Sequence, residues 1–495
     1  MAKILLVNPN KWGRGITAIW IASHTAAIRE SGHEVKLFDA TFYSQWTENE
    51  IAYNTLNQQY RPTNYESYIK WNDGDIVEDL QNMVNWFQPD VIFWSALSSH
   101  IHGEGEYVNI QYGYDLVSFL ATDALLVTGG LQATSSPKSV LEIFPKTDYL
   151  IRGESDLILP ALLDRIQAGQ EVKDLAGLAW IQDGELFNAS RQEIIRNMND
   201  IPQYDYSLFD EQVFYRPYNG HVVKGVDYEM SRGCIYSCSY CVETVIQKYY
   251  GCMETSNRSG SLLAPGNYLR CKTALRVFRE LEYLNRKLGI TLFRCQDTNF
   301  LTINRKMLLE LGELLEQAGL DIMLYIETRI DKMNIGDIKL LKKLRVDGVG
   351  AGVEVASEEF REGHLKRFAS RSKIIDNAKK LREAGIKLTT YNIIGLPEET
   401  EAMIIDTINF NRMIAPNNIT VAFFSPYTGT VQADKGAALS YYNSEACDVD
   451  GQLRSVGNPE VVDLDLLNFY KKHFSHFVRS GLSDLDQLKQ KENIA

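Results

Sequence analysis

Two long series of alternating strand-like and helix-like segments constrain the fold of this chain more than any other feature. In the first series, strand-like apolar runs cover residues 3–7, 34–38, 90–95, 124–128 and 148–152, and segments with helical spacing lie between them. Strands that alternate with helices favour a parallel sheet with helices on both faces. We therefore expect an α/β fold that begins with a doubly wound, Rossmann-like domain over residues 1–168. Ligands of such a domain bind at the carboxyl ends of its strands.

The second series predicts a barrel-like sheet over residues 226–428, either closed or partly open. It consists of six strand-helix units, whose strand-like runs cover 227–232, 290–296, 322–328, 348–353, 387–393 and 419–424. Residues 169–225 lack sustained periodicity and are expected to connect the two domains. Residues 429–495 are expected to form a small C-terminal region that becomes helical.

Composition and charge narrow the class of ligand. A hydrophobic content of 45% with 23% charged residues is typical of a globular protein. The formal net charge of −13 argues against nucleic acid, because binding to a phosphate backbone depends on clustered Lys and Arg. We therefore expect a small-molecule or peptide substrate. The sequence has no apolar run near the ~20 residues of a membrane span, and its start does not resemble a signal peptide, so we expect a cytoplasmic protein.

Three cysteines stand close together in the stretch SRGCIYSCSYC, residues 231–241. Thiolates are ligands for both zinc and iron-sulfur clusters. Structural zinc usually takes four protein ligands, and the other four of the seven cysteines form no second CxxC pair. Three thiolates on a four-iron cluster would leave one iron open to a small ligand. A loop with buried or incidental thiols is the alternative that the spacing leaves open.

The spacing of these cysteines, with Tyr240 before the last of them, resembles the signature of the radical S-adenosylmethionine (SAM) superfamily. The resemblance implies a [4Fe-4S] cluster on Cys234, Cys238 and Cys241, whose open iron binds SAM. It also implies an electron donor for the cluster and cleavage of SAM to a 5'-deoxyadenosyl radical.

Further motifs of that family follow the predicted barrel strands, at the face where barrel enzymes assemble their sites. They are residues 296–297, 327–329, the GAGVEVAS stretch 350–357, the IIGLPEET stretch 393–400 and the SPYTGT turn 425–430. Val355 replaces the more usual Ser, and Thr428 replaces Pro. The resemblance implies SAM contacts from Tyr240, Asp297, Glu327, Arg329, Glu354, Ile394 and Gly395. Three of these, Asp297, Glu327 and Glu354, also fit strand-end caps or ion-pair partners.

The first domain resembles the cobalamin-binding subclass of radical SAM enzymes through VTGGLQAT, 127–134, and LIRGESD, 150–156. Asn8-Pro9-Asn10-Lys11-Trp12-Gly13 stands where other cobalamin proteins carry DxHxxG with a cobalt-binding His, and both the Asp and the His are replaced. The resemblance therefore implies cobalamin with its own base detached and no protein imidazole below the metal. The residues that it implies for cobalamin are Asn8, Asn10, Gly13, Ser95, Leu97, Ser98, Gly129, Gly130 and Glu154. Leu97 or Ser98 is expected nearest the cobalt. His24, His100 and His102 are other possible ligands, although His24 lies in a predicted helix and is expected to pack there.

Together these resemblances predict a cobalamin-dependent radical SAM enzyme that methylates an unactivated carbon. In the family mechanism, one SAM supplies the methyl group through methylcobalamin, and a second SAM supplies the radical that activates the substrate. A cobalamin-binding radical SAM cyclase, oxidase or ring-rearranging enzyme is the alternative within enzymes. A cobalamin sensor or a zinc-stabilised scaffold is the alternative outside them.

Overall fold

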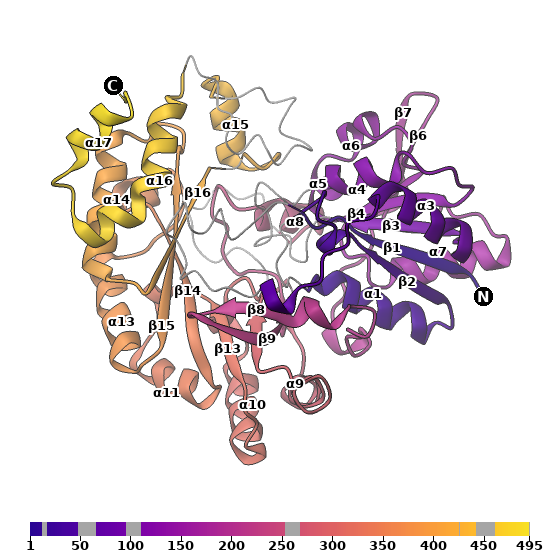
Figure 1. Cartoon of the computed structure of the whole chain (residues 1–495), viewed down its shortest axis with the longest axis horizontal. Helices are drawn as coiled ribbons and strands as arrows, with labels where there is room; N and C mark the ends of the chain where they lie inside the picture. Colours follow the sequence, from indigo (N-terminus) through magenta and orange to yellow (C-terminus); the bar gives the residue numbers. More distant parts are fainter. Residues whose placement is uncertain are drawn as a thin grey trace.

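The computed structural model describes residues 1–11, 17–47, 66–95, 110–252, 268–424, 426–441 and 461–494. It contains two seven-stranded sheets, one in an N-terminal unit and one in a barrel-like unit, which lie next to each other in Figure 1. The predicted cofactor contacts Gly13, Leu97 and Ser98 lie outside the described residues, as do His100 and His102.

The N-terminal sheet has the strand order β2-β1-β3-β4-β5-β6-β7, and its first five strands are parallel. These strands are β1 Lys3–Asn8, β2 Glu34–Asp39, β3 Val91–Ser95, β4 Leu125–Gly129 and β5 Tyr149–Ile151. Every residue of β3 is buried, as expected for a strand covered on both faces. The surrounding helices are α1 Ile19–Glu30, α3 Ile76–Phe87, α4 Ile110–Val117, α5 Leu131–Ser135, α6 Pro137–Ile143 and α7 Ile158–Ala168. The doubly wound prediction is confirmed.

Two strands that the sequence interpretation did not expect extend this sheet beyond Ala168. β6 Leu178–Gln182 pairs antiparallel with β5, and β7 Glu185–Asn188 pairs antiparallel with β6. The signal was Asp183-Gly184, a two-residue turn with positive φ at both positions, which is typical of a hairpin. β7 is mostly exposed, so it lacks the apolar pattern that identifies strands in a sequence.

The barrel sheet has the order β16-β15-β14-β13-β12-β9-β8. Six strands are parallel, as predicted, and β8 Tyr215–Tyr218 adds an antiparallel edge. The six are β9 His221–Tyr228, β12 Leu292–Cys295, β13 Met323–Glu327, β14 Val346–Glu354, β15 Lys387–Ile394 and β16 Asn418–Phe423. In the described part of the chain β8 and β16 are the two ends of the sheet, so the barrel is partly open rather than closed.

The first predicted barrel strand, 227–232, is divided in the structure. β9 ends at Tyr228, and β10 Ser231–Arg232 forms a separate pair with β11 Arg270–Cys271. The helices that alternate with the barrel strands are α9 Ala274–Leu288, α10 Arg305–Ala318, α11 Ile335–Lys343, α13 Arg371–Glu383 and α14 Glu401–Ile414. Two short helices, α8 Glu243–Tyr249 and α12 Glu358–Gly363, follow β10 and β14 respectively.

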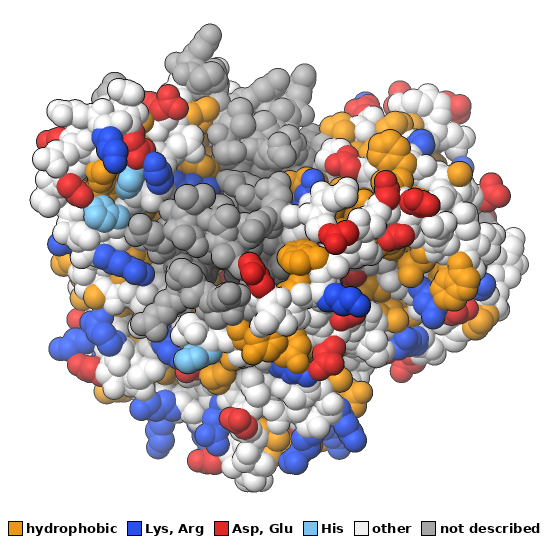
Figure 2. Space-filling view, in the orientation of Figure 1, with side chains coloured by type: hydrophobic (Ala, Val, Ile, Leu, Met, Phe, Trp, Pro, Cys, Tyr) orange, Lys and Arg blue, Asp and Glu red, His pale blue; other side chains and the backbone are white. Residues whose placement is uncertain are grey.

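The C-terminal region contains α15 Val431–Ala438, α16 Leu464–Ser480 and α17 Leu485–Lys491. The aromatic side chains of α16 are buried in a core that also contains Ile394, Ile404 and Ile419. On the face drawn in Figure 2, basic side chains are interspersed with acidic ones along the lower rim of the barrel. None of the described helices is both long and apolar enough to cross a membrane.

Candidate functional site

The cysteine loop follows β10 and ends at α8. Cys234 and Cys238 are buried, and Cys241 is half-buried. Burial raises the pKa of Cys234 to about 12 and that of Cys241 well above its usual range, and the charge of the neighbouring Cys238 raises both further. The three thiols therefore lie close enough to repel one another as thiolates. Thiolates gathered in this way require a positive partner, which iron ions supply.

The geometry of the loop also bears on which metal group it fits. Within the described residues, no three His, Cys, Asp or Glu side chains are placed to hold a single metal ion. A four-iron cluster is wider than one ion, so its thiolates stand further apart than the ligands of zinc. The three thiols are neighbours in this loop, as the cluster implied by the cysteine motif requires.

Hydrogen bonds from three elements fix the backbone of the cysteine loop. The Gln247 side chain of α8 donates to the carbonyl oxygens of Cys234 and Tyr236, at 2.9 and 3.1 Å. Ser239 donates through its backbone N–H to the carbonyl of Leu365 and through its hydroxyl to that of His364. The backbone N–H of Gln432, in α15, donates to the carbonyl of Ser239. The loop is therefore held in one shape by the protein itself.

Glu354, at the end of β14, is the centre of a polar cluster beside this loop. The Tyr240 hydroxyl donates to Glu354 Oε1 at 3.0 Å, and Arg367 Nη1 lies 3.8 Å from the same oxygen. Burial and the Glu354 charge raise the pKa of Tyr240 well above its usual value, so the phenol remains a hydrogen-bond donor. Glu354 has φ of +60°, in the left-handed region, next to a register shift in β14. The sequence interpretation named Tyr240 and Glu354 but missed Arg367.

Glu327 and Arg329, at the end of β13, are both buried and both engaged. The Tyr391 hydroxyl donates to Glu327 Oε1 at 3.1 Å. The fork of Arg329 donates to the Asp331 carboxylate at 3.0 and 3.3 Å and to the carbonyl of Phe368 at 2.6 Å. The fork predicted for a cofactor carboxylate thus binds a carboxylate of the protein in this structure.

Asp297 follows β12, and its fully buried side chain lies against the turn between β9 and β10. It accepts hydrogen bonds from the backbone N–H groups of Met230 and Ser231 and from the Ser231 hydroxyl. Burial raises its pKa to about 7. Asp297 therefore shapes the backbone that leads into the cysteine loop, which corresponds to the strand-end cap that the sequence left open.

The turn after β15 presents its backbone, not its side chains. Ile394 is fully buried in the core formed with α16. Gly395 has φ of +80° and donates its N–H to Glu399 Oε2 at 2.7 Å. A ligand at this turn would meet the backbone of Gly395 and its neighbours.

Small and neutral residues form the carboxyl edge of the N-terminal sheet. The side chains of Asn8 and Asn10 donate to Asp39 and Thr41, which ties the end of β1 to that of β2. Ser95 donates to the carbonyl of Gly129 at 3.1 Å. Gly130 has φ of +104°, and a Cβ there would lie 2.9 Å from the Ser95 hydroxyl. This edge leaves room for close approach to the backbone.

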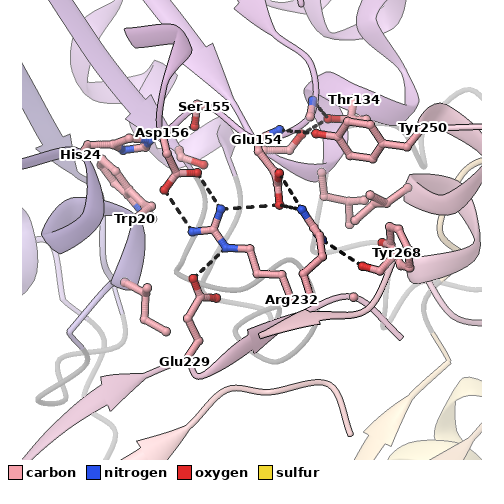
Figure 3. A pocket seen from close by; sticks show the side chains of 18 residues that line it. Trp20, His24, Thr134, Glu154, Ser155, Asp156, Glu229, Arg232, Tyr250 and Tyr268 are labelled. Carbon is pink, nitrogen blue, oxygen red and sulfur yellow. Dashed lines mark hydrogen bonds and ion pairs between the residues drawn. The ribbon is translucent and has the colours of Figure 1, made fainter. Parts of the chain in front are cut away.

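A pocket lies between this edge and residues of the barrel unit that flank the cysteine loop (Figure 3). It brings together three predicted cofactor residues, Ser95, Gly130 and Glu154, with residues of the barrel unit such as Tyr250 and Tyr268. His24 also lines it. Burial lowers the pKa of His24 to about 4, and its Nε2 lies 2.9 Å from the Ser155 hydroxyl. His24 is thus packed as a neutral imidazole, as predicted, and its Nδ1 has no hydrogen-bond partner in the described part of the chain.

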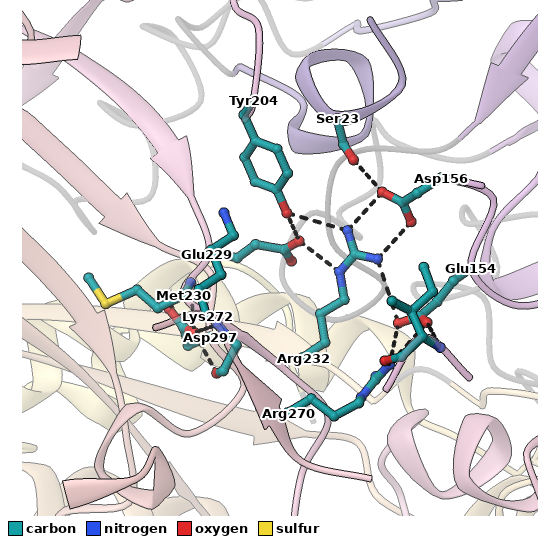
Figure 4. A network of polar contacts seen from close by, with 12 residues as sticks. Ser23, Glu154, Asp156, Tyr204, Glu229, Met230, Arg232, Arg270, Lys272 and Asp297 are labelled. Atoms are coloured by element: carbon teal, nitrogen blue, oxygen red, sulfur yellow. Dashed lines mark hydrogen bonds and ion pairs between the residues drawn. The ribbon is translucent and has the colours of Figure 1, made fainter. Parts of the chain in front are cut away.

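A buried network of charged side chains, which the sequence interpretation missed, crosses the same pocket (Figure 4). The fork of Arg232, in β10, binds Asp156 at 2.7 and 3.0 Å, and its Nε donates to Glu229 at 2.7 Å. Glu154 accepts from Arg270 at 3.0 Å. No sequence signal pairs these residues, because Asp156 and Arg232 are 76 positions apart.

Comparison with known proteins identifies sequences that are similar to this chain. Residues 228–410 match the model of the radical SAM superfamily. An uncharacterized methyltransferase of Pyrococcus horikoshii is 25% identical over 71% of this chain and 70% of its own length. An anaerobic magnesium-protoporphyrin IX monomethyl ester cyclase of Cereibacter sphaeroides is 25% identical over 71% of this chain and 54% of its own length.

Two solved structures share the fold across both units. The radical S-adenosylmethionine methyltransferase TsrM from Kitasatospora setae, solved with cobalamin and a [4Fe-4S] cluster, covers 89% of this chain and 78% of its own. Its TM-score is 0.63 at 17% identity. The cobalamin-dependent S-adenosylmethionine radical enzyme OxsB, solved with aqua-cobalamin and S-adenosylmethionine, covers 100% of this chain and 62% of its own. Its TM-score is 0.58 at 13% identity.

Proposed function

We propose that this chain, whose residues 228–410 match the radical SAM superfamily, is a cobalamin-dependent methyltransferase. It moves a methyl group from SAM to an unactivated carbon of a small-molecule or peptide substrate. One observation carries the proposal. The carboxyl edge of the doubly wound sheet and the residues that flank the three-thiol loop of the barrel border a single pocket, lined by Ser95 and Gly130 on one side and by Gly233, next to Cys234, and Tyr250 on the other.

Cys234, Cys238 and Cys241 would hold the [4Fe-4S] cluster, and the chain supplies the loop that holds them in place. When bound, the cluster and cobalamin supply one-electron cleavage of SAM and carriage of the methyl group. Because burial raises the pKa of Cys234 and Cys241, these two thiols would lose their protons when metal binds. An external electron donor for the cluster is part of the proposal.

Polar side chains at the barrel edge would bind SAM. Tyr240, Glu354 and Arg367 form a preassembled set beside the cysteine loop. A carboxylate such as Glu354 or Glu327 accepts hydrogen bonds from an ammonium or a ribose, and a guanidinium suits the carboxylate of SAM. At the turn after β15, the backbone around Gly395 would contact the adenine, because the side chain of Ile394 is in the core.

The N-terminal edge would bind cobalamin through its backbone and small side chains. The glycine pair Gly129-Gly130 and the pocket behind it suit a ligand that approaches closely. His24 stays neutral, so the pocket adds no charge of its own at that position.

A cyclase is the second candidate, because three of the relatives matched by sequence are anaerobic magnesium-protoporphyrin IX monomethyl ester cyclases. The matched regions cover 54%, 60% and 48% of those proteins. Such an enzyme would cleave SAM without moving its methyl group.

Incubation with SAM that carries a deuterated methyl group separates the two candidates without knowledge of the substrate. The protein is loaded with iron, sulfide and cobalamin under anaerobic conditions and is supplied with a reductant. For a methyltransferase we expect deuterated methyl in the cobalamin fraction and one S-adenosylhomocysteine for each methyl transferred. Formation of 5'-deoxyadenosine with no S-adenosylhomocysteine would contradict methyl transfer and favour the cyclase.

A further inference from the structure

The Arg232 side chain joins the two units of the molecule through a buried clamp of ion pairs. We propose that Arg232 and Asp156 are positioning residues, which fix the cysteine loop at a set distance from the cobalamin-binding edge. The inference rests on the proposed function, because it assumes that the cluster and cobalamin bind on the two sides of the clamp and must lie at a fixed distance from each other.

The clamp is buried on both sides. The side chains of Arg232, Asp156 and Glu229 are 9%, 6% and 5% exposed. Asp156 follows β5 of the N-terminal unit, whereas Arg232 belongs to β10 of the barrel unit. The contact is a two-pronged one, with both Nη atoms of Arg232 on the two oxygens of Asp156. A fork of this kind fixes direction as well as distance.

Neighbouring groups hold each half of the clamp in place. On the N-terminal side, the Ser23 hydroxyl of α1 donates to Asp156. On the barrel side, the Tyr204 hydroxyl donates to Glu229 at 2.5 Å, and Glu229 in turn accepts from Arg232. Arg270, on the strand paired with β10, binds Glu154 two residues before Asp156.

Short stretches of chain connect the clamp to both cofactor regions. A single residue, Gly233, separates Arg232 from Cys234. Gly233 has φ of +94°, and a Cβ there would lie 2.4 Å from the carbonyl oxygen of Tyr268, so the backbone of Gly233 packs closely against that of Tyr268. On the other side, Asp156 lies on the loop that includes Gly153 and Glu154 at the pocket. A displacement of Arg232 would therefore move the cysteine loop relative to that loop.

Stability alone does not account for the clamp. Removing several charges from water costs about as much as their attraction returns, so buried ion pairs add little stability over well-packed apolar residues. Their geometry is the distinctive gain. Burial would raise the pKa of Asp156, but Arg232 holds it well below its usual range. Asp156 is therefore ionised at physiological pH, and its ion pair with Arg232 holds the two units at a fixed separation.

The test substitution is Asp156→Asn, which keeps the size of the side chain and removes one charge. The matched control is Asp406→Asn, which breaks the same two-pronged contact, Arg371 to Asp406 at 2.8 and 3.1 Å, between the barrel helices α13 and α14. Three quantities are measured: iron and cobalt content, the rate of deuterated methyl transfer from SAM to cobalamin, and the distance distribution between the reduced cluster and cob(II)alamin by pulsed electron paramagnetic resonance.

For Asp156→Asn we expect wild-type iron and cobalt, a broader distance distribution and a methyl-transfer rate lower by about 10²-fold, the penalty for small misplacement of reacting groups. Asp406→Asn should match wild type in all three. A wild-type rate and distance distribution in Asp156→Asn would overturn the clamp, and so would loss of cobalt, which would make Asp156 a cobalamin ligand. If Asp156→Asn fails to fold, Ser23→Ala retains every charge and should broaden the distribution to a smaller degree; an unchanged distribution would overturn the clamp.

The two proposals fail differently. Wild-type protein that binds both metals but transfers no methyl group would contradict the methyltransferase, while the distance distribution of Asp156→Asn would still decide the clamp. Wild-type protein without cobalt would overturn both.

Discussion

The two large sheets of this molecule differ in the residues at the carboxyl ends of their central parallel strands. At the N-terminal edge, β3 and β4 end in small, uncharged residues, Ser95, Gly129 and Gly130, whereas charged residues, Asp39 and Glu154, stand at the end of β2 and after β5. The barrel edge consists of buried charged residues such as Glu327 and Glu354, each held by a tyrosine hydroxyl. A buried charge needs a partner, so the barrel edge is arranged before any ligand arrives. The small, uncharged residues at the ends of β3 and β4 suit a large ligand bound through backbone groups.

The comparison predicts its largest effect at the cysteine loop. Cys238→Ala removes one of the three proposed cluster ligands and should abolish 5'-deoxyadenosine formation and most of the iron, because two thiolates would not hold the cluster. Cys271→Ala, at a half-buried cysteine outside the loop, is the control and should retain both. The measurements are iron content and product analysis by mass spectrometry. Full cleavage activity in Cys238→Ala would contradict the cluster assignment.

A methyl group added at Gly130 should weaken the binding of cobalamin. Gly130→Ala introduces a Cβ 2.9 Å from the Ser95 hydroxyl at a φ of +104°. Relief of this clash would displace the Gly130 backbone or the Ser95 hydroxyl, and a loss of about 1–3 kcal/mol of binding free energy would lower cobalamin affinity by about 10- to 100-fold, with SAM cleavage retained.

Gly169→Ala tests whether that effect is specific to the pocket. Gly169 also has positive φ, at +63°, but has nothing within 4 Å of its added Cβ. It should cost stability of about 1 kcal/mol and leave cobalamin affinity unchanged. Equal loss of affinity in both variants, measured by spectroscopic titration, would show that Gly130 acts through general stability.

A smaller effect is expected at the charged edge. Tyr240→Phe removes the hydroxyl that donates to Glu354 and should weaken SAM binding by about 3- to 10-fold without loss of iron, as expected for a net loss of about 0.5–1.5 kcal/mol for one ordinary hydrogen bond. Tyr218→Phe is matched to it, because the Tyr218 hydroxyl donates to Asp347 at 2.8 Å near the start of β14. Only Tyr240→Phe should change the affinity measured by equilibrium binding. Equal affinity in the two variants would remove Tyr240 from the SAM site.

The smallest effect concerns the pH dependence of stability. Burial raises the pKa of Asp297 from 3.8 to about 7, so the native state holds a proton that the unfolded chain has lost between these values. The associated stability is fully present below pH ~4 and is lost as pH rises through ~7. Asp297→Asn cannot titrate and should flatten the decline of Tm from pH 4 to 7, whereas Ser231→Ala retains the carboxylate and the decline. Identical slopes in wild type and Asp297→Asn would contradict this origin.

The sequence predicted the arrangement of elements better than the contacts between them. The parallel strands were recognisable because each is an apolar run that alternates with an amphipathic helix. The β6–β7 hairpin was missed because β7 is mostly exposed, although Asp183-Gly184 marked its turn. The clamp was beyond prediction, because nothing local to Arg232 indicates a partner 76 positions away.

Among the site residues, local motifs indicated which strand end a side chain occupies but not what it binds there. Tyr240 and Glu354 were predicted separately and do meet, at 3.0 Å. Arg329 was expected to bind a cofactor carboxylate, yet Asp331, two residues further along the chain, already binds its fork. Whether the Arg329 fork binds Asp331 or a cofactor depends on three-dimensional packing, which the spacing of residues in the sequence does not record.

Iron and cobalt content per chain, measured after anaerobic purification with cobalamin supplied, tests the central claim most directly. The account predicts about four irons and one cobalt in wild type. It also predicts that Cys238→Ala loses iron but keeps cobalt, and that Gly130→Ala loses cobalt but keeps iron, because the two edges bind separately. Folded wild-type protein with neither metal, or with iron alone, would contradict it.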